Sequence, residues 1–272
     1  MTRPSPGFVA LFAAALLAAV SAAFGQTVYE SFSYSSGALL SGESGGTGFS
    51  AGWTDSHGFT IHSASPLTVS GWSGTGNYLD ITAAQNVSRA LGSSLAGDTW
   101  ISFLLQPDSG TLTYGGLTVG FGDASLNGNH TGTNTGMFVG FSGATFGVGT
   151  NGGGGLTISG GTAAIGTAQF LVVDFNFADA TSGTVTLYVN ATPTGTLGSA
   201  AGSAPFTLAT SDVIGFGAGG NGASFDELRI GNSFAAVTPI PEPAGVAAGL
   251  ALCALGAVGV REHRRRRQLA AT

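Results

Sequence analysis

Apolar and polar residues alternate along several stretches in the middle of the chain. Between residues 183 and 190, valine and leucine alternate with threonine and tyrosine, and residues 169–176 place leucine, valine and phenylalanine on one face. A period of two puts the apolar side chains on one side of a β-strand. The short linker 178–182 separates the two runs, so together they predict an antiparallel hairpin.

Other short segments give the same signal, and no segment between the two ends of the chain keeps a helical period of 3.6. The remaining predicted strands are Thr27–Ser33, Leu67–Val69, Tyr78–Ile81, Val87–Leu91, Trp100–Gln106, 117–121, 137–141, Ala144–Val148, Val213–Ala218 and Ala223–Ile230. Many short strands with turn signals between them indicate a sandwich or a barrel.

The last predicted strand is irregular. Leu228 and Ile230 share one face, whereas Phe225 falls on the other. The phase therefore breaks near Asp226 and Glu227, where we expect a β-bulge.

The N-terminus has the pattern of an export signal. Arg3 precedes an apolar run over residues 9–20, and Ala23 and Gly25 supply small residues at the −3 and −1 positions of a cleavage site. We therefore expect cleavage after Gly25, with Gln26 as the first residue of the mature protein.

The C-terminus has the pattern of a membrane anchor. Pro241, Glu242 and Pro243 precede 17 uncharged residues, 244–260, which as a helix would extend about 26 Å, at the short end of the transmembrane range. The basic stop after it consists of Arg261, Arg264, Arg265, Arg266 and Arg267. By the positive-inside rule this tail stays in the cytoplasm.

These signals divide the chain into five parts. They are the signal peptide 1–25, an exported domain 26–236, a linker 237–243 with the Pro-Glu-Pro motif, a transmembrane helix 244–260 and a basic cytoplasmic tail 261–272. The only cysteine, Cys253, falls in the helix, so the exported domain is free of disulfides. Glycine accounts for 47 of 272 residues, which we attribute to turns and bends between strands.

The charge of the exported part is strongly acidic. The chain has no lysine, and Arg89 and Arg229 are the only basic residues between Gln26 and Ile240, where twelve acids give a net charge of −10. Nucleic acid is excluded as a partner, because phosphate binding needs clustered lysine or arginine. Neutral glycans and divalent cations remain compatible with this surface.

The motif Pro241-Glu242-Pro243, the apolar helix and the arginine-rich tail together resemble the PEP-CTERM sorting signal of Gram-negative bacteria. The resemblance covers residues 238–267. It implies export across the inner membrane, membrane anchoring, and processing by an exosortase-type sorting transpeptidase that leads to the cell surface or the extracellular matrix. It also implies exopolysaccharide as a partner.

The exported part resembles the laminin-G/concanavalin-like jelly rolls, an all-β fold of antiparallel β-sandwich type. The resemblance is carried by Tyr29-Glu30-Ser31-Phe32, Leu187-Tyr188-Val189-Asn190 and Phe225-Asp226-Glu227-Leu228-Arg229-Ile230-Gly231. It implies that the first and last strands lie side by side. The fold includes lectins, glucanases and adhesive modules, and so does not select a function.

Candidate sites in the exported part are weak, and no catalytic residue, metal site or cofactor is assigned. Adjacent Asp226 and Glu227 are expected to point to opposite faces of a strand, with structural roles such as pairing with Arg229. Other polar or aromatic groups considered are His57, His62 and His130 (zinc), Asp123, Asn127, Asn129 and Asn134 (calcium), Asn151–Gly155 (phosphate) and Trp53, Trp72 and Trp100 (sugar stacking). Turn chemistry and core packing explain these groups more simply.

Three functions follow from the sequence. The first is a non-catalytic structural or adhesive component of the envelope or biofilm. The alternative is a carbohydrate-binding module that uses the concave sheet face, and a glycoside hydrolase ranks last, because no array of alternating acids occurs.

Overall fold

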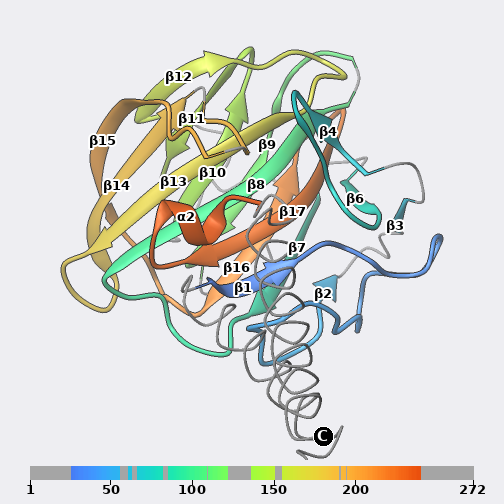
Figure 1. The fold of residues 1–272 in the computed structure, drawn as a ribbon, viewed down its shortest axis with the longest axis horizontal. Coiled ribbons are helices and arrows are strands. Elements are labelled where there is room, and N and C mark those ends of the chain that lie inside the picture. The colour runs from blue at the N-terminus through green and yellow to red at the C-terminus, as the bar shows by residue number, and fades with distance from the viewer. Residues whose placement is uncertain are drawn as a thin grey trace, which may run out of the picture. The chain divides into compact units, whose positions relative to one another are not determined.

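The protein is described by a computed structural model in which two antiparallel β-sheets pack face to face (Figure 1). The residues described are 26–55, 61–62, 66–81, 85–108, 110–121, 136–150, 155–189, 191–193 and 195–239. The all-β antiparallel sandwich expected from the alternation is confirmed. The signal peptide, most of the Pro-Glu-Pro linker, the apolar segment and the basic tail lie outside these residues.

The larger sheet contains, within the described ranges, eight strands. In spatial order they are Ser199–Thr207 (β15), Ser182–Val189 (β14), Gln169–Phe177 (β13), Asp98–Pro107 (β8), Ala223–Gly231 (β17), Tyr78–Ile81 (β6) and Ile61–His62 (β3), with Gln26–Glu30 (β1) also pairing with β17. The pairing of β1 with β17 places the first and last strands side by side, as the jelly-roll resemblance implies.

The second sheet has seven strands in the part of the chain that is described. In spatial order they are Ile158–Thr162 (β12), Thr145–Gly149 (β11), Met137–Ser142 (β10), Tyr114–Val119 (β9), Val213–Ala218 (β16), Gln85–Ala90 (β7) and Thr54–Asp55 (β2). All its strand pairs are antiparallel.

The main core lies between the sheets and is rich in phenylalanine. Phe216 of the second sheet is fully buried, with its ring centroid 6.0 Å from that of Phe103 and 4.7 Å from that of Phe225, both on the larger sheet. Phe32 and Trp53 extend this cluster, with centroids 5.8 and 6.1 Å from Phe216. Close-packed aromatic contacts of this kind supply much of the burial that a domain without disulfides needs.

A second, smaller apolar cluster covers the outer face of the larger sheet. The hairpin of Thr68–Val69 (β4) and Trp72–Ser73 (β5) packs there, as does the one-turn helix Phe234–Val237 (α2) (Figure 1). The Ser233 side chain caps the helix, and the hydroxyl of Ser102 donates to the carbonyl of Val237 at 2.5 Å. These contacts extend the folded domain to Thr238.

The predicted bulge in the last strand is confirmed. The register of β17 against β8 shifts between Asp226 and Arg229, and Glu227 has a φ of 54°. On its other side β17 pairs first with β6 and then with β1, so the bulge lies where the partner strand changes. The extra residue restores the phase, and Phe225 and Leu228 both face the main core.

The predicted hairpin of residues 169–176 and 183–190 is confirmed, with Val173 opposite Leu187. The first strand is shorter than expected and ends at Glu30 instead of Ser33. Phe32 breaks it with a φ of 48°, because its backbone N–H turns to donate to the Glu30 carboxylate at 2.9 Å. Strands β2, β3, β5, β12 and β15, and helix α2, were not predicted.

Glycine has a second role besides the turns and bends expected for it. Gly140 lies opposite Gly116 on one side and Gly147 on the other, and Gly116 lies opposite Gly217. A Cβ atom at Gly116 or Gly140 would come closer to the adjacent strand than real Cβ atoms do. Glycine therefore also permits close approach of strands inside the second sheet.

Within the described residues, no helix combines the length and the apolar character needed to cross a membrane.

Candidate functional site

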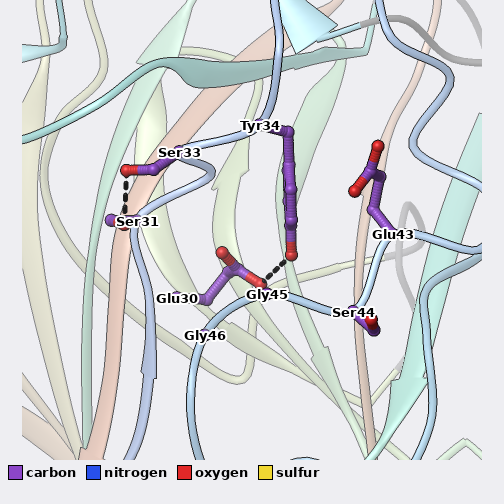
Figure 2. A pocket seen from close by; sticks show the side chains of 8 residues that line it. All are labelled: Glu30, Ser31, Ser33, Tyr34, Glu43, Ser44, Gly45 and Gly46. Carbon is purple, nitrogen blue, oxygen red and sulfur yellow. Dashed lines mark hydrogen bonds between the residues drawn. The ribbon is translucent and has the colours of Figure 1, made fainter.

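A small pocket opens beside the end of β1, with a volume of about 230 Å³. Its lining residues are Glu30, Ser31, Ser33, Tyr34, Glu43, Ser44, Gly45 and Gly46 (Figure 2). Carboxylates, hydroxyls and bare backbone dominate this lining. The pocket is therefore a polar site formed by two neighbouring segments, 30–34 and 43–46.

Glu30 forms the floor of the pocket and is buried, with 1% of its surface exposed. Its Oε1 atom accepts from the backbone of Phe32 at 2.9 Å. Its Oε2 atom accepts from the Tyr34 hydroxyl at 2.6 Å, from Trp53 Nε1 at 3.2 Å and from Arg89 at 2.8 Å. A buried carboxylate is tolerated when it is paired and hydrogen-bonded, as this one is.

Arg89 connects the two sheets, because it lies on β7 while Glu30 lies on β1. Its Nε atom donates to the carbonyl of Ala51 at 2.7 Å, and its guanidinium carbon lies 3.9 Å from the centre of the Phe49 ring. Its charge is thus compensated inside the domain, away from the pocket opening.

The Tyr34 hydroxyl points toward Glu30, as Figure 2 shows. Burial raises the pKa of Tyr34, and the neighbouring Glu30 carboxylate raises it further. The phenol therefore stays protonated at physiological pH and acts as a hydrogen-bond donor to the floor.

Two glycines keep the pocket wall open. A Cβ atom at Gly45 would lie 2.7 Å from Cε1 of Tyr34, and one at Gly46 would lie 3.1 Å from Oε2 of Glu30. Gly46 also has a φ of +72°, which disfavours any other residue. At the rim, the hydroxyls of Ser31 and Ser33 are 2.9 Å apart. The wall thus presents backbone and hydroxyl groups.

The bulge of β17 forms a second acidic site, and it corrects the expectation that Asp226 and Glu227 point to opposite faces. Asp226 accepts from the backbone of Leu67 at 3.1 Å, and Glu227 accepts from the backbone and hydroxyl of Thr75 at 2.6 and 2.7 Å. Both side chains therefore contact the β4–β5 hairpin. The reason is the positive φ of Glu227, which breaks the alternation of a regular strand.

Glu227 also pairs with Arg229 at 2.8 Å, as expected. The Arg229 guanidinium lies 4.7 Å from the centre of the Tyr29 ring, and the Tyr29 hydroxyl donates to Glu227 at 3.2 Å. Burial raises the pKa of Asp226 to about 8, and the Glu227 carboxylate adds to the effect. These acids hold the hairpin against the sheet.

A third acidic group lies near the end of β8. The Ser224 hydroxyl donates to Asp108 at 2.7 Å, and burial raises the pKa of Asp108 to about 7, with the Asp80 carboxylate contributing. Among the described residues, no three histidine, cysteine, aspartate or glutamate side chains gather in a way that would hold a metal ion.

Of the three tryptophans considered as a sugar-stacking platform, Trp53 lies in the main core, whereas Trp72 and Trp100 both pack against the smaller cluster on the outer face. Trp72 contacts Phe170 at a centroid distance of 6.3 Å, and Trp100 stacks on Tyr188 at 5.3 Å.

The other sequence-based candidates fall largely outside the described residues. These are the calcium loop, His57, His130, Asn151–Gly154, the signal-cleavage residues Ala23 and Gly25, the Pro-Glu-Pro motif and the arginines of the tail.

Sequence reasoning missed the Glu30–Arg89 pair. A signal was present, because Arg89 falls between Val87 and Leu91 at the inward-facing positions of a predicted strand. An arginine in such a position needs a buried partner. The identity of that buried partner, and the pocket beside it, could not be predicted from a single sequence, because Glu30 lies 59 residues away from Arg89 in the chain.

No protein-family model matches the chain, and no curated protein matches it. Three solved structures are among those similar to it. A protein of unknown function from Shewanella oneidensis MR-1 has 13% identity and a TM-score of 0.45, over 75% of this chain and 84% of that one. The carbohydrate recognition domain of Emp47p has 11% identity and a TM-score of 0.38, over 76% and 97%. Trypanosoma rangeli sialidase, in complex with 2,3-difluorosialic acid, has 9% identity and a TM-score of 0.40, over 79% and 32%. Similarities this low carry no argument about the function of this chain.

Proposed function

We propose that this chain is an exported, membrane-anchored protein whose laminin-G/concanavalin-like domain faces the cell exterior as a non-catalytic structural or adhesive component of the surface or matrix. In this proposal an exosortase-type transpeptidase recognises Pro241-Glu242-Pro243 and removes the C-terminal segment. Exopolysaccharide is the partner that the sorting signal suggests.

The ends of the folded domain carry the proposal. Strand β1 covers Gln26–Glu30, directly after the expected cleavage site in the sequence, and helix α2 ends at Val237, shortly before Pro241. Gln26 lies opposite Gly231 in the sheet, so the first strand begins where the last strand ends. In the sequence, the two expected processing points therefore lie on either side of the described strands and helix, so cleavage at both would leave these elements intact.

The distribution of charge supports an exterior role. Of the described residues, Arg89 and Arg229 are the only arginines, and each is paired with a glutamate at 2.8 Å. The remaining charges on the described surface are carboxylates. A surface of this kind keeps a protein soluble and repels polyanions.

The non-catalytic part of the proposal is supported by the roles of the acids. Glu30 receives four hydrogen bonds, and Asp226 and Glu227 fasten the hairpin at residues 67 and 75. A general acid or base needs a carboxyl group that is free to reach a substrate. The acids that the sequence offered to a hydrolase are instead occupied by the fold.

Mass spectrometry tests the sorting. The chain is expressed in a Gram-negative host that contains an exosortase, and in the same host without it. We expect an N-terminus at Gln26 in both hosts and loss of the residues after the Pro-Glu-Pro motif only in the first. Replacing Glu242 with alanine should preserve the tail in both. Recovery of the intact arginine-rich tail from the exosortase host would contradict processing.

A further inference from the structure

The groups that line the pocket beside β1 are of the kinds found in binding sites for small ligands. Its opening carries the hydroxyls of Ser31, Ser33 and Ser44 and the carboxylate of Glu43, and Tyr34 forms one wall (Figure 2). Ser33 and Ser44 are exposed, and Glu43 is partly exposed, so these groups are accessible to a ligand. The volume of about 230 Å³ is below the usual range of about 300–1,000 Å³ for small-molecule sites, which restricts the ligand to a small one.

The charge balance of the pocket excludes an anion. Arg89 neutralises Glu30 from behind the floor, at 2.8 Å, and its other contacts are with Ala51, the Tyr34 hydroxyl and the Phe49 ring. No other basic side chain lines the pocket. Glu43 therefore leaves the opening with one net negative charge.

The same balance disfavours a divalent cation. Calcium is usually bound by six to eight oxygen atoms that include several carboxylate ligands. Glu30 is already occupied by four donors, so Glu43 is the one carboxylate of the lining that could bind such an ion. A single partly exposed carboxylate is a weak ligand set.

A neutral polyhydroxylated ligand fits the remaining groups. Serine hydroxyls donate and accept, and a carboxylate accepts from ligand hydroxyls. The part of the half-buried Tyr34 ring that Gly45 does not cover offers apolar surface for C–H groups of a sugar ring, and the backbone at Gly45 offers polar groups. The glycines at 45 and 46 keep this wall free of side chains that would run into Tyr34 and Glu30.

We propose that the pocket formed by residues 30–34 and 43–46 binds a single uncharged sugar residue of a glycan, with Glu43 and the three serines contacting its hydroxyls. This proposal gives the proposed exterior protein a specific ligand class. It places the ligand at the end of β1, and not on the concave sheet face.

Saturation-transfer NMR on the full chain in mild detergent tests the proposal. The probes are methyl glucoside, methyl galactoside, methyl mannoside and N-acetylglucosamine, with galacturonate as the anionic counterpart. We expect transfer to at least one neutral sugar, with a Kd of about 1 mM for so small a ligand, and none to galacturonate. Removal of divalent cations by a chelator should leave binding unchanged.

Variants locate the binding. Ser44→Trp should fill the pocket and abolish transfer, and Glu43→Ala should weaken binding about tenfold, as expected for the loss of a hydrogen bond to a charged group. Ser93→Trp, at an exposed serine that does not line the pocket, is the matched control and should bind as the parent does. Circular dichroism confirms that each variant is folded, and Ser33→Trp replaces Ser44→Trp if the latter does not fold.

Three results would overturn the proposal: no transfer to any neutral sugar, binding that persists in Ser44→Trp and Ser33→Trp, or binding that requires a divalent cation. Its failure is distinguishable from failure of the sorting proposal. A correctly processed chain that binds no sugar would contradict only the proposal that the pocket binds sugar. A chain that binds sugar but keeps its tail in the exosortase host overturns only the processing.

Discussion

Replacing Arg89 with methionine should lower the free energy of unfolding by about 3–5 kcal/mol, because removal of one partner leaves a buried charge uncompensated. Glu30 and Arg89 are 1% and 3% exposed, so water does not replace the missing partner. Methionine keeps much of the apolar length of arginine. The change therefore tests the charge more than the packing.

The contacts of Arg89 support this magnitude. The substitution removes the 2.8 Å ion pair with Glu30, the 2.7 Å hydrogen bond to the carbonyl of Ala51 and the contact with the Phe49 ring at 3.9 Å. The cation–π contact alone is worth about 0.5–2 kcal/mol. A domain of this size is typically stable by about 5–15 kcal/mol, so the loss would be a large fraction of the total.

Urea unfolding at pH 7, followed by tryptophan fluorescence, measures the effect. Trp53 reports on it directly, since its Nε1 atom donates to Glu30. The double variant Glu30→Gln with Arg89→Met removes both charges and should recover most of the lost stability. Arg229→Met is the control, and it should cost less because the Arg229 side chain is 12% exposed. A loss below about 1 kcal/mol for Arg89→Met, or a double variant as unstable as the single one, would refute the reasoning.

Three further predictions concern the acids and the outer face. The folded-state pKa values of about 8 for Asp226 and about 7 for Asp108 exceed the ordinary 3.8, so the folded chain binds more protons than the unfolded chain between about pH 4 and pH 8. Stability should therefore fall as the pH rises through this window, and the urea midpoint should be higher at pH 5 than at pH 8; an equal or reversed order would contradict it. Gly74→Ala places a Cβ atom 2.5 Å from Asp226 Oδ2 and should destabilise the domain by about 1–3 kcal/mol, measured by thermal unfolding. Ser102→Ala leaves the Val237 carbonyl without its 2.5 Å donor, costing about 1–3 kcal/mol, and should speed proteolysis near residue 237.

Strands with strong alternation could be predicted from the sequence. The hairpin of β13 and β14 was found because its apolar residues alternate and a short polar linker joins its strands. The bulge near Asp226 was found from the break in phase. The break in phase did not predict where the two acidic side chains point. The positive φ of Glu227 turns both Asp226 and Glu227 toward one hairpin.

Strands without alternation could not be predicted. Strand β15 begins Ser-Ala-Ala-Gly-Ser and alternates only at its end, where Ala204 and Phe206 are buried, and β12 reads Ile-Ser-Gly-Gly-Thr, without a periodic apolar face. Each forms at the edge of a sheet by hydrogen bonding to a neighbour, β15 to β14 and β12 to β11. Pairing with an existing edge, and not local propensity, stabilises such strands.

The candidate pocket depends on the same kind of distant contact. Its floor requires Arg89 of one sheet to meet Glu30 of the other, and its wall requires segment 43–46 to return beside β1. The isolated bridge between Tyr29 and Thr47 is what brings that segment back. None of these contacts is indicated by a pattern in the local sequence. The pocket could therefore not be predicted, although each residue that lines it is present in the sequence.

The buried acids determine how the stability of the domain changes with pH. Because the two arginines of the described residues are paired with Glu30 and Glu227, burial dominates at Asp108 and Asp226 and raises their pKa values. Their ionisation costs stability as the pH rises, and their protonation at lower pH removes that cost. A fold built in this way is stabilised by mild acid. Mildly acidic surroundings should therefore strengthen the domain, in the same direction as the relief of repulsion among its acidic side chains.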